Sequence, residues 1–112
     1  MSLEAAKKTG SKLPFEKLWN LLVKIPEGHV MSYASVAKKL NLKNPRNVGW
    51  MLKQNKAAPR IPCHRVVRSD GSIGGYNGKV AGKEVERKIK LLKDEGVSFL
   101  SNGKINPDCI RM

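Results

Sequence analysis

The sequence predicts a mainly helical fold with a small β element, in which two of the helices form a helix-turn-helix unit. Apolar residues recur at helical spacing in several separate stretches of the chain. Two of these stretches are short and are joined by a tight polar link, which is the arrangement of a helix-turn-helix. Extended pieces are brief. A chain of 112 residues is long enough for one domain with a modest core.

The first helix is predicted in the stretch "PFEKLWNLLVKI". Its proline, Pro14, suits the first position of a helix, where no amide hydrogen bond is lost. Pro26 and Gly28 end the helix. The apolar residues that follow i, i+3, i+4, i+7 spacing are Phe15, Leu18, Trp19 and Leu22.

The helix-turn-helix unit is predicted next, after a short extended piece at Val30 and Met31. Ser32 is the expected N-cap of its first helix. One face of that helix carries Tyr33, Val36, Ala37 and Leu40. In the second helix, Asn44 is the expected N-cap and Pro45 the first residue, and the inward side chains are Val48 and Leu52. A plain packing pair of helices has the same pattern, so this alternative stays open.

The rest of the chain predicts a loop, a last helix and a hairpin. Residues 56–80 are loop-like and contain a short strand through Val66 and Val67. The last helix lies in "GKEVERKIKLLKDEG" and ends at Gly96, its C′ residue. Its expected inward residues are Val85, Ile89 and Leu92. The stretch "VSFLSNGKIN" predicts a hairpin about Asn102-Gly103.

The charge of the chain indicates an anionic partner. Lysine and arginine number 22 against 9 acidic residues, a formal net charge of +13. Nucleic acid is the expected partner, and a solvated basic surface is the alternative. A membrane is not expected, because no apolar run reaches about 18 residues and the lysines are spread along the chain.

The N-terminal residues and the number of cysteines indicate the cellular compartment. Residues 1–12 lack the apolar region of a signal peptide and are expected to be a flexible lead-in to a domain spanning 13–112. Two cysteines, Cys63 and Cys109, do not make a disulfide framework. A reducing compartment is therefore expected, the cytoplasm or, in a eukaryote, the nucleus.

Cys63 stands in the stretch "PCHRVVRSDGSIGGY" and has three possible interpretations: a buried core thiol, a metal ligand or a nucleophile. Free cysteine is commonly a small buried hydrophobe. A metal site is not expected, because the available cysteines and histidines show neither CxxC nor HxxxH spacing. A papain-like protease would need a larger chain. The proline- and glycine-rich surroundings favour a reactive residue.

A reactive thiol needs help to ionise, and the neighbours of Cys63 offer it. His64 and Arg65 follow directly, and nearby positive charge or a base lowers the pKa of a thiol. A histidine acting as base needs an acceptor on its other ring nitrogen. The last helix offers several carboxylates, and spacing does not choose among Glu84, Glu86, Asp94 and Glu95.

The motif "IPCHRVV", with "SYASVA" and "RNVG" upstream, resembles the O6-alkylguanine-DNA alkyltransferases, also called methylated-DNA–protein-cysteine methyltransferases. The resemblance covers about residues 14–97 and only the family's C-terminal DNA-binding and active-site domain; the usual N-terminal α/β domain is missing. It implies a winged-helix-like, helix-turn-helix DNA-binding domain.

The resemblance also implies an activity. The alkyl group of O6-alkylguanine, with O4-alkylthymine as a further candidate, would move irreversibly to Cys63 after the damaged base flips out of the duplex. Each molecule would react once, without metal or organic cofactor. The expected partner is double-stranded DNA entered from the minor groove, and the expected state is a monomer.

Roles follow position by position from the resemblance. Cys63 would accept the alkyl group, and His64 would deprotonate it through a water. Glu95 would orient the histidine, and Asn55 would brace the active-site turn. Tyr33 would contact the flipped nucleotide and protonate the leaving guanine.

The remaining implied roles concern the flipped base and the DNA. Arg46 would fill the hole that the base leaves. Arg65 would brace the site and is also expected to be one of the residues that bind DNA or the base. Tyr76 would stack beside the guanine. Asn77 falls where a serine often donates a hydrogen bond to O6.

Each role has a structural alternative. Tyr33 could be a core aromatic, His64 a satisfied structural histidine and Arg46 a surface residue, although a cation at a helix start opposes the helix dipole. Asn55 could be a helix C-cap, and Glu95 could pair with a lysine. Cys109 is expected to be structural.

Departures from the family pattern leave rival functions open. Trp50 stands where the family carries glycine or alanine, and the link through residues 77–88 is longer than usual, which affects the placement of Asn77 and Glu95. One rival is a non-enzymatic sensor of alkylated DNA that recruits other repair factors; alkyltransferase-like proteins of this kind usually carry tryptophan at the cysteine position. The other is a helix-turn-helix regulator that reads sequence in the major groove.

Overall fold

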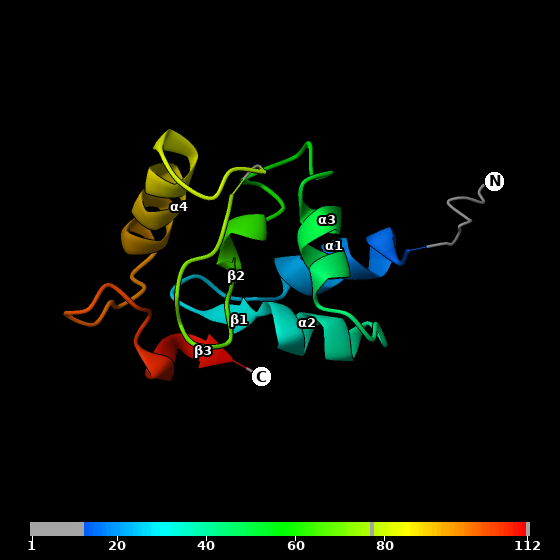
Figure 1. Cartoon of the computed structure of the whole chain (residues 1–112), viewed down its shortest axis with the longest axis horizontal. Coiled ribbons are helices and arrows are strands. Elements are labelled where there is room, and N and C mark those ends of the chain that lie inside the picture. The colour runs from blue at the N-terminus through cyan, green and yellow to red at the C-terminus, as the bar shows by residue number, and fades with distance from the viewer. Residues whose placement is uncertain (1–12, 77, 112) are drawn as a thin grey trace.

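Helices dominate the fold, and a small sheet lies between them, as the sequence predicts (Figure 1). The computed structural model describes residues 13–76 and 78–111. The lead-in 1–12 and Asn77 lie outside the described residues. The α-helices are α1 (Phe15–Val23), α2 (Tyr33–Lys39), α3 (Arg46–Leu52) and α4 (Lys83–Asp94). The strands are β1 (Val30–Ser32), β2 (Val66–Val67) and β3 (Ile110–Arg111), and short 3-10 helices span η1 (Cys63–Arg65) and η2 (Pro107–Cys109).

The sheet is parallel and has the order β2-β1-β3. Met31 of β1 pairs with Val66, and Val30 pairs with Ile110. Parallel neighbours need long crossovers: α2 and α3 lie in the connection between β1 and β2, and the chain also passes through α4 before β3 pairs with β1. The extended pieces at Val30–Met31 and Val66–Val67 are therefore strands, as predicted. No sequence pattern predicted β3.

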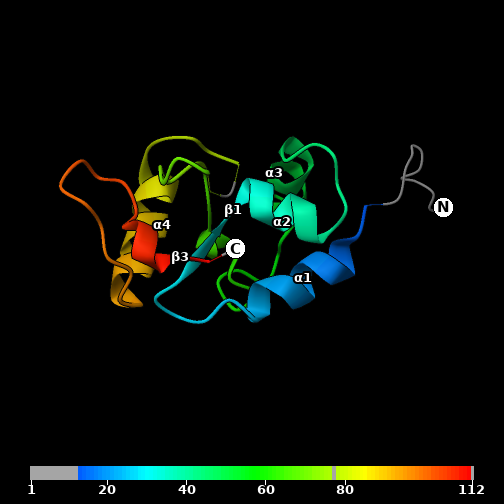
Figure 2. The same ribbon diagram turned by 90° about the horizontal axis from the view of Figure 1, so that it is seen from below.

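The sheet separates two cores, with α4 on one side and α1, α2 and α3 on the other in both views (Figures 1 and 2). Successive strand residues point to opposite faces, so Met31 and Val66 join one core while Val30 and Val67 join the other. The first, the helical core, also holds Leu18, Leu22, Val36, Val48, Met51 and Cys63. The second, the α4 core, also holds Leu92, Val97, Ile105 and Cys109.

In the helix-turn-helix unit, Ser32 caps α2 as the sequence predicts, whereas α3 begins at Arg46 with Pro45 at its N-cap position, one residue later than predicted. The amide of Ser35 donates to Ser32 Oγ at 3.0 Å, and the amide of Arg46 donates to Asn44 Oδ1 at 2.9 Å. Both hydrogen bonds satisfy amides near a helix start, which have no partner within the helix. They fix where each helix begins, and so place Tyr33 and Arg46 at the starts of their helices.

The α4 helix corrects one prediction. Val85 and Ile89 are only partly buried, and the residues that α4 buries are Lys88 and Leu92. The helix is therefore rotated from the expected face, because the Lys88 ammonium group finds hydrogen-bond acceptors beneath the helix.

The end of α4 and the hairpin after it follow the predictions. Gly96 adopts φ +93°, and the amide of Val97 donates to the Leu92 carbonyl at 2.9 Å, a Schellman C-cap. The hairpin about Asn102-Gly103 is closed by the antiparallel bridge between Phe99 and Ile105. In the described part of the chain, no helix is both long and apolar enough to span a bilayer.

Candidate active site

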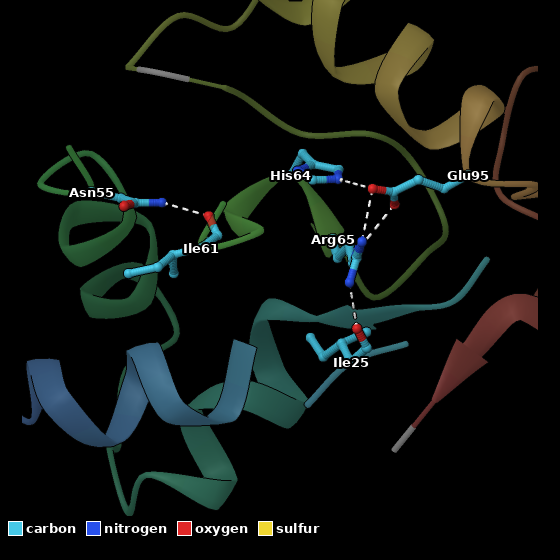
Figure 3. A network of polar contacts seen from close by, with 6 residues as sticks. All are labelled: Ile25, Asn55, Ile61, His64, Arg65 and Glu95. Atoms are coloured by element: carbon cyan, nitrogen blue, oxygen red, sulfur yellow. Dashed lines mark hydrogen bonds and ion pairs between the residues drawn. The ribbon is translucent and has the colours of Figure 1, made fainter. Parts of the chain in front are cut away.

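Cys63 lies at the start of a short turn that Asn55 holds in shape. The Asn55 amide donates from Nδ2 to the Ile61 carbonyl at 2.8 Å (Figure 3). It also accepts at Oδ1 from the Ala57 amide at 2.9 Å. One side chain thus ties both sides of the loop that follows α3. The 3-10 helix η1 then leads Cys63 directly into β2. Asn55 thus bonds to two backbone groups of this loop, and its implied role in the activity stays a prediction.

The Cys63 side chain is buried, with 4% of its surface exposed, but it lines a pocket of about 220 Å³. Tyr33 and Tyr76 line the same pocket, together with Leu52 of α3. Glycines make room for it; a Cβ on Gly75 would lie 2.7 Å from the Lys79 carbonyl oxygen. Cys63 is therefore both a core residue and a pocket residue, which the alternative of a purely structural thiol does not require.

The pocket holds Cys63 mainly as the neutral thiol. Burial raises the pKa of the Cys63 thiol, while hydrogen bonds from Asn55 and Tyr76 and the positive charge of Lys88 act in the opposite direction. A thiol in this state needs a base to become a nucleophile.

Beside Cys63, one carboxylate joins His64 and Arg65. Glu95 Oε2 lies 2.9 Å from His64 Nε2, and Arg65 donates to both Glu95 oxygens at 2.9 and 2.8 Å (Figure 3). Arg65 also donates to the Ile25 carbonyl at 2.6 Å. The structure thus brings Glu95 to His64, a choice among four carboxylates that spacing left open. Arg65 thus links Glu95 to the Ile25 carbonyl, and its implied role in the site stays a prediction.

These contacts fix the protonation of His64. Burial raises the pKa of Glu95, but the hydrogen bonds from Arg65 and His64 outweigh it, so the pKa is lowered and the carboxylate is ionised. An ionised carboxylate only accepts, so His64 carries its proton on Nε2. Burial lowers the pKa of His64 despite the hydrogen bond to Glu95. The imidazole is therefore neutral at pH 7, and its buried Nδ1 has no partner among the described residues.

Tyr33 and Tyr76 form two walls of the pocket. Burial raises the pKa of Tyr33, although Arg68 lowers it, and raises the pKa of Tyr76 to about 12. Both phenols therefore stay protonated at neutral pH and can donate hydrogen bonds. The Tyr33 hydroxyl also faces Gly74, where a Cβ would lie 3.1 Å away.

Arg46 lies apart from Cys63, in a second hollow of about 270 Å³. Arg68 lines this hollow too, and Tyr33, Gly49 and Gly75 line both hollows. Arg46 is exposed at the start of α3. Trp50 is 50% exposed and packs on Phe15, with ring centroids 6.1 Å apart. It lines neither hollow.

Sequence reasoning missed Lys88 and Arg68. Lys88 lies between Val85 and Leu92, beside the core face that the sequence predicts for α4, and a charged residue at that position was the available signal. Arg68 follows β2 in a loop and gave no signal. Among the described residues, no group of three or more His, Cys, Asp or Glu side chains could hold a metal ion.

Comparison with known proteins places this geometry in a family. Residues 14–97 match the family described as "6-O-methylguanine DNA methyltransferase, DNA binding domain". A methylated-DNA–protein-cysteine methyltransferase of Pyrobaculum aerophilum is 47% identical over 75 residues, which are 67% of this chain and 47% of that protein.

Solved structures show the same fold. The O6-methylguanine-DNA methyltransferase of Pyrococcus kodakaraensis has a TM-score of 0.64 at 39% identity, over 74% of this chain and 46% of that one. S. pombe Atl1, in complex with damaged DNA containing O6-carboxymethylguanine, has a TM-score of 0.71 at 25% identity, over 88% and 94% of the two chains. The chain spans less than half the length of the first curated relatives it matches.

Proposed function

Because the chain belongs to the 6-O-methylguanine DNA methyltransferase family through its DNA-binding domain, we propose that it repairs DNA by moving the alkyl group of O6-alkylguanine to Cys63. The observation that carries this proposal is the placement of Cys63. The thiol lines a pocket, and the next residue is a neutral histidine held by a carboxylate. A family relative that only bound alkylated bases would not need this arrangement.

The transfer is a displacement at carbon. His64 takes the thiol proton at Nδ1 through a water. The thiolate sulfur attacks the alkyl carbon, an S–C bond forms, and the C–O6 bond breaks with its electron pair going to guanine. Tyr33 donates a proton to the leaving guanine and recovers it from solvent. A thioether has no easy return path, so one molecule reacts once.

The pocket can hold a base only after that base leaves the duplex, since O6 inside the stack cannot reach a buried sulfur. Tyr76 flanks the flipped guanine, and Arg46 enters the vacated position. The helix-turn-helix carries Tyr33 and Arg46 at the starts of its two helices, which suits an approach of α3 to the minor groove. Residues 13–112 act as one DNA-binding and active-site domain in this proposal.

The experiment is a mass measurement on the protein after incubation with duplex DNA containing O6-methylguanine. The protein is expected to gain the mass of one methylene, on the tryptic peptide 61–65 and not on 105–111. An unchanged mass after long incubation with excess substrate would replace transfer with lesion sensing. The similarity to Atl1 over 94% of its length keeps that second function in view.

DNA binding should depend strongly on salt and weakly on sequence. The net charge of +13 motivates this expectation. If about four phosphates are contacted, log K falls against log salt with a slope of roughly −4. Fluorescence anisotropy with several undamaged duplexes at different salt concentrations measures the slope. A strong preference for one undamaged sequence would favour the regulator that reads the major groove.

Glu95→Gln is expected to slow transfer on the order of tenfold, because losing one charge-assisted hydrogen bond costs about 1.5 kcal/mol or more. The glutamine can present its NH2 group to His64, which removes the acceptor that holds the neutral tautomer. Lesion binding should change little, because Glu95 does not line the pocket.

The matched control is Asp94→Asn, next in the chain. Asp94 is exposed and pairs with Lys90 at 3.0 Å, away from His64. Single-turnover rates and lesion affinity are measured for both variants, with thermal melting to check folding. Equal rates for Glu95→Gln and the parent protein would remove Glu95 from the mechanism.

A further inference from the structure

Lys88 is a buried charged residue that the proposed mechanism does not use. It lies in the middle of α4 with 1% of its surface exposed, among the largest fully buried side chains of the described residues. Burying an ammonium group is costly unless the charge is compensated. The contacts of this group therefore show what it stabilises.

Three backbone carbonyls surround the ammonium group. Lys88 Nζ donates to the carbonyl oxygens of Val66 at 2.7 Å, Ile73 at 2.7 Å and Gly75 at 3.0 Å. An ammonium group has three donors and no acceptor, so the three bonds use all of them and suit the charged form. Val66 follows the Cys63 turn, and Gly75 lines the pocket. One side chain thus joins α4, β2 and the pocket wall.

The charge also faces the reactive side of the site. Lys88 Nζ lies 5.9 Å from the centre of the Tyr33 ring. The thiolate form of Cys63 and the Lys88 ammonium stabilise each other, while Arg68 acts against the ammonium. Burial lowers the pKa of Lys88 to about 7, so both of its forms are populated near neutral pH, and the negative charge of the Cys63 thiolate favours the ammonium form.

Extending the proposed function, we propose that Lys88 is a positioning residue of the Cys63 site. Its buried ammonium group holds the pocket wall against β2 and provides the positive charge that stabilises the thiolate formed when His64 removes the proton. The inference rests on the proposed function for its meaning in repair. The test, however, measures the thiol itself and needs no DNA.

Lys88 differs in charge from the other side chains around Cys63. The other groups that face Cys63 are Asn55 and two protonated phenols, Tyr33 and Tyr76. They can donate hydrogen bonds to a thiolate but carry no positive charge. His64 is neutral before it takes the proton, and the Arg65 guanidinium is bound to Glu95. Among the described residues, Lys88 is the buried cation whose positive charge lowers the pKa of the Cys63 thiol.

The experiment compares two neutral variants with a charge-matched control. Lys88→Met keeps the length of the side chain and removes both the charge and the donors. Lys88→Gln removes the charge and keeps two donors, so it retains part of the carbonyl contacts. Lys90→Met removes one exposed lysine from the same helix, which changes the net charge equally.

Iodoacetamide labelling across a range of pH reports the thiolate fraction of Cys63. Tryptic peptides 61–65 and 105–111 separate Cys63 from Cys109 by mass spectrometry. Lys88→Met and Lys88→Gln are expected to lower the thiolate fraction about tenfold at neutral pH and below, where the Lys88 ammonium group is populated, as loss of a nearby opposite charge does. Lys90→Met should match the parent protein.

The outcomes separate charge from structure. If folded Lys88→Gln labels with the pH profile of the parent protein, Lys88 is a structural strut and the proposal falls. If Lys90→Met lowers labelling as much, the effect comes from net charge and the proposal also falls. A third outcome is that the Lys88 variants label less than the parent protein while the parent protein takes no methyl group from DNA. In that case the proposed function fails and the inference about the Cys63 thiol stands.

Discussion

Cys63→Ser is expected to abolish alkyl transfer to within the detection limit of the assay. A serine hydroxyl ionises far less readily than a thiol, and the neutral imidazole of His64 cannot generate a useful alkoxide concentration at neutral pH. The sulfur is also the more effective nucleophile toward an alkyl carbon. The pocket itself should survive, because serine differs from cysteine by one atom, and Asn55 holds the turn through backbone groups.

The second cysteine provides the control. Cys109 is also buried, but it belongs to the α4 core on the other side of the sheet, where its sulfur accepts from the Ser98 amide at 3.5 Å. Cys109→Ser should transfer at the rate of the parent protein. Radioactive methyl transfer from duplex DNA, with lesion binding measured in parallel, tests both variants. Full transfer by Cys63→Ser would place the acceptor elsewhere and end the assignment.

Features fixed by neighbouring residues were predictable from the sequence. The N-cap Ser32, the Asn44 side chain before α3 and the C′ residue Gly96 each bond or turn within a few residues of their own position, so their local chemistry is enough. The motif that contains Cys63 also names its partners His64 and Arg65 directly. For this reason the helix starts, the reactive turn and the mainly helical class all follow from local patterns.

Features that depend on distant parts of the chain were not predictable in the same way. Which carboxylate reaches His64 depends on how α4 runs across the sheet. The spacing of residues in the sequence does not give that path, so it could not select Glu95. β3 pairs with β1 from the far end of the chain and has only two residues. Lys88 interrupts the apolar pattern of α4, and it can be buried because the Val66 and Gly75 carbonyls, which lie far away in the sequence, accept from its ammonium group. The rotation of α4 is a consequence of those tertiary contacts.

Arg46→Ala is expected to slow transfer from duplex DNA about a hundredfold. Flipping a base costs a few kcal/mol, and a factor of ten corresponds to about 1.4 kcal/mol. Arg46 is exposed at the start of α3 and lines the hollow beside the Cys63 pocket. A cation there opposes the helix dipole, so its position suits insertion into the DNA. Its planar guanidinium can occupy the space between stacked bases, which a lysine ammonium cannot do.

The free O6-alkylguanine base separates this role from phosphate binding and from chemistry, since a free base needs no flipping. Arg46→Ala should react with it nearly as fast as the parent protein. Arg46→Lys should recover only part of the rate on duplex DNA, because it restores the charge without the flat surface.

The control for charge is Lys43→Ala, which removes an exposed cation from the turn before α3. This variant should weaken binding to damaged and undamaged DNA alike and reduce the salt slope by about one. Equal slowing of Arg46→Ala on duplex and free base would place its effect in the pocket or in folding, because only a residue that stabilises the flipped state can distinguish the two substrates.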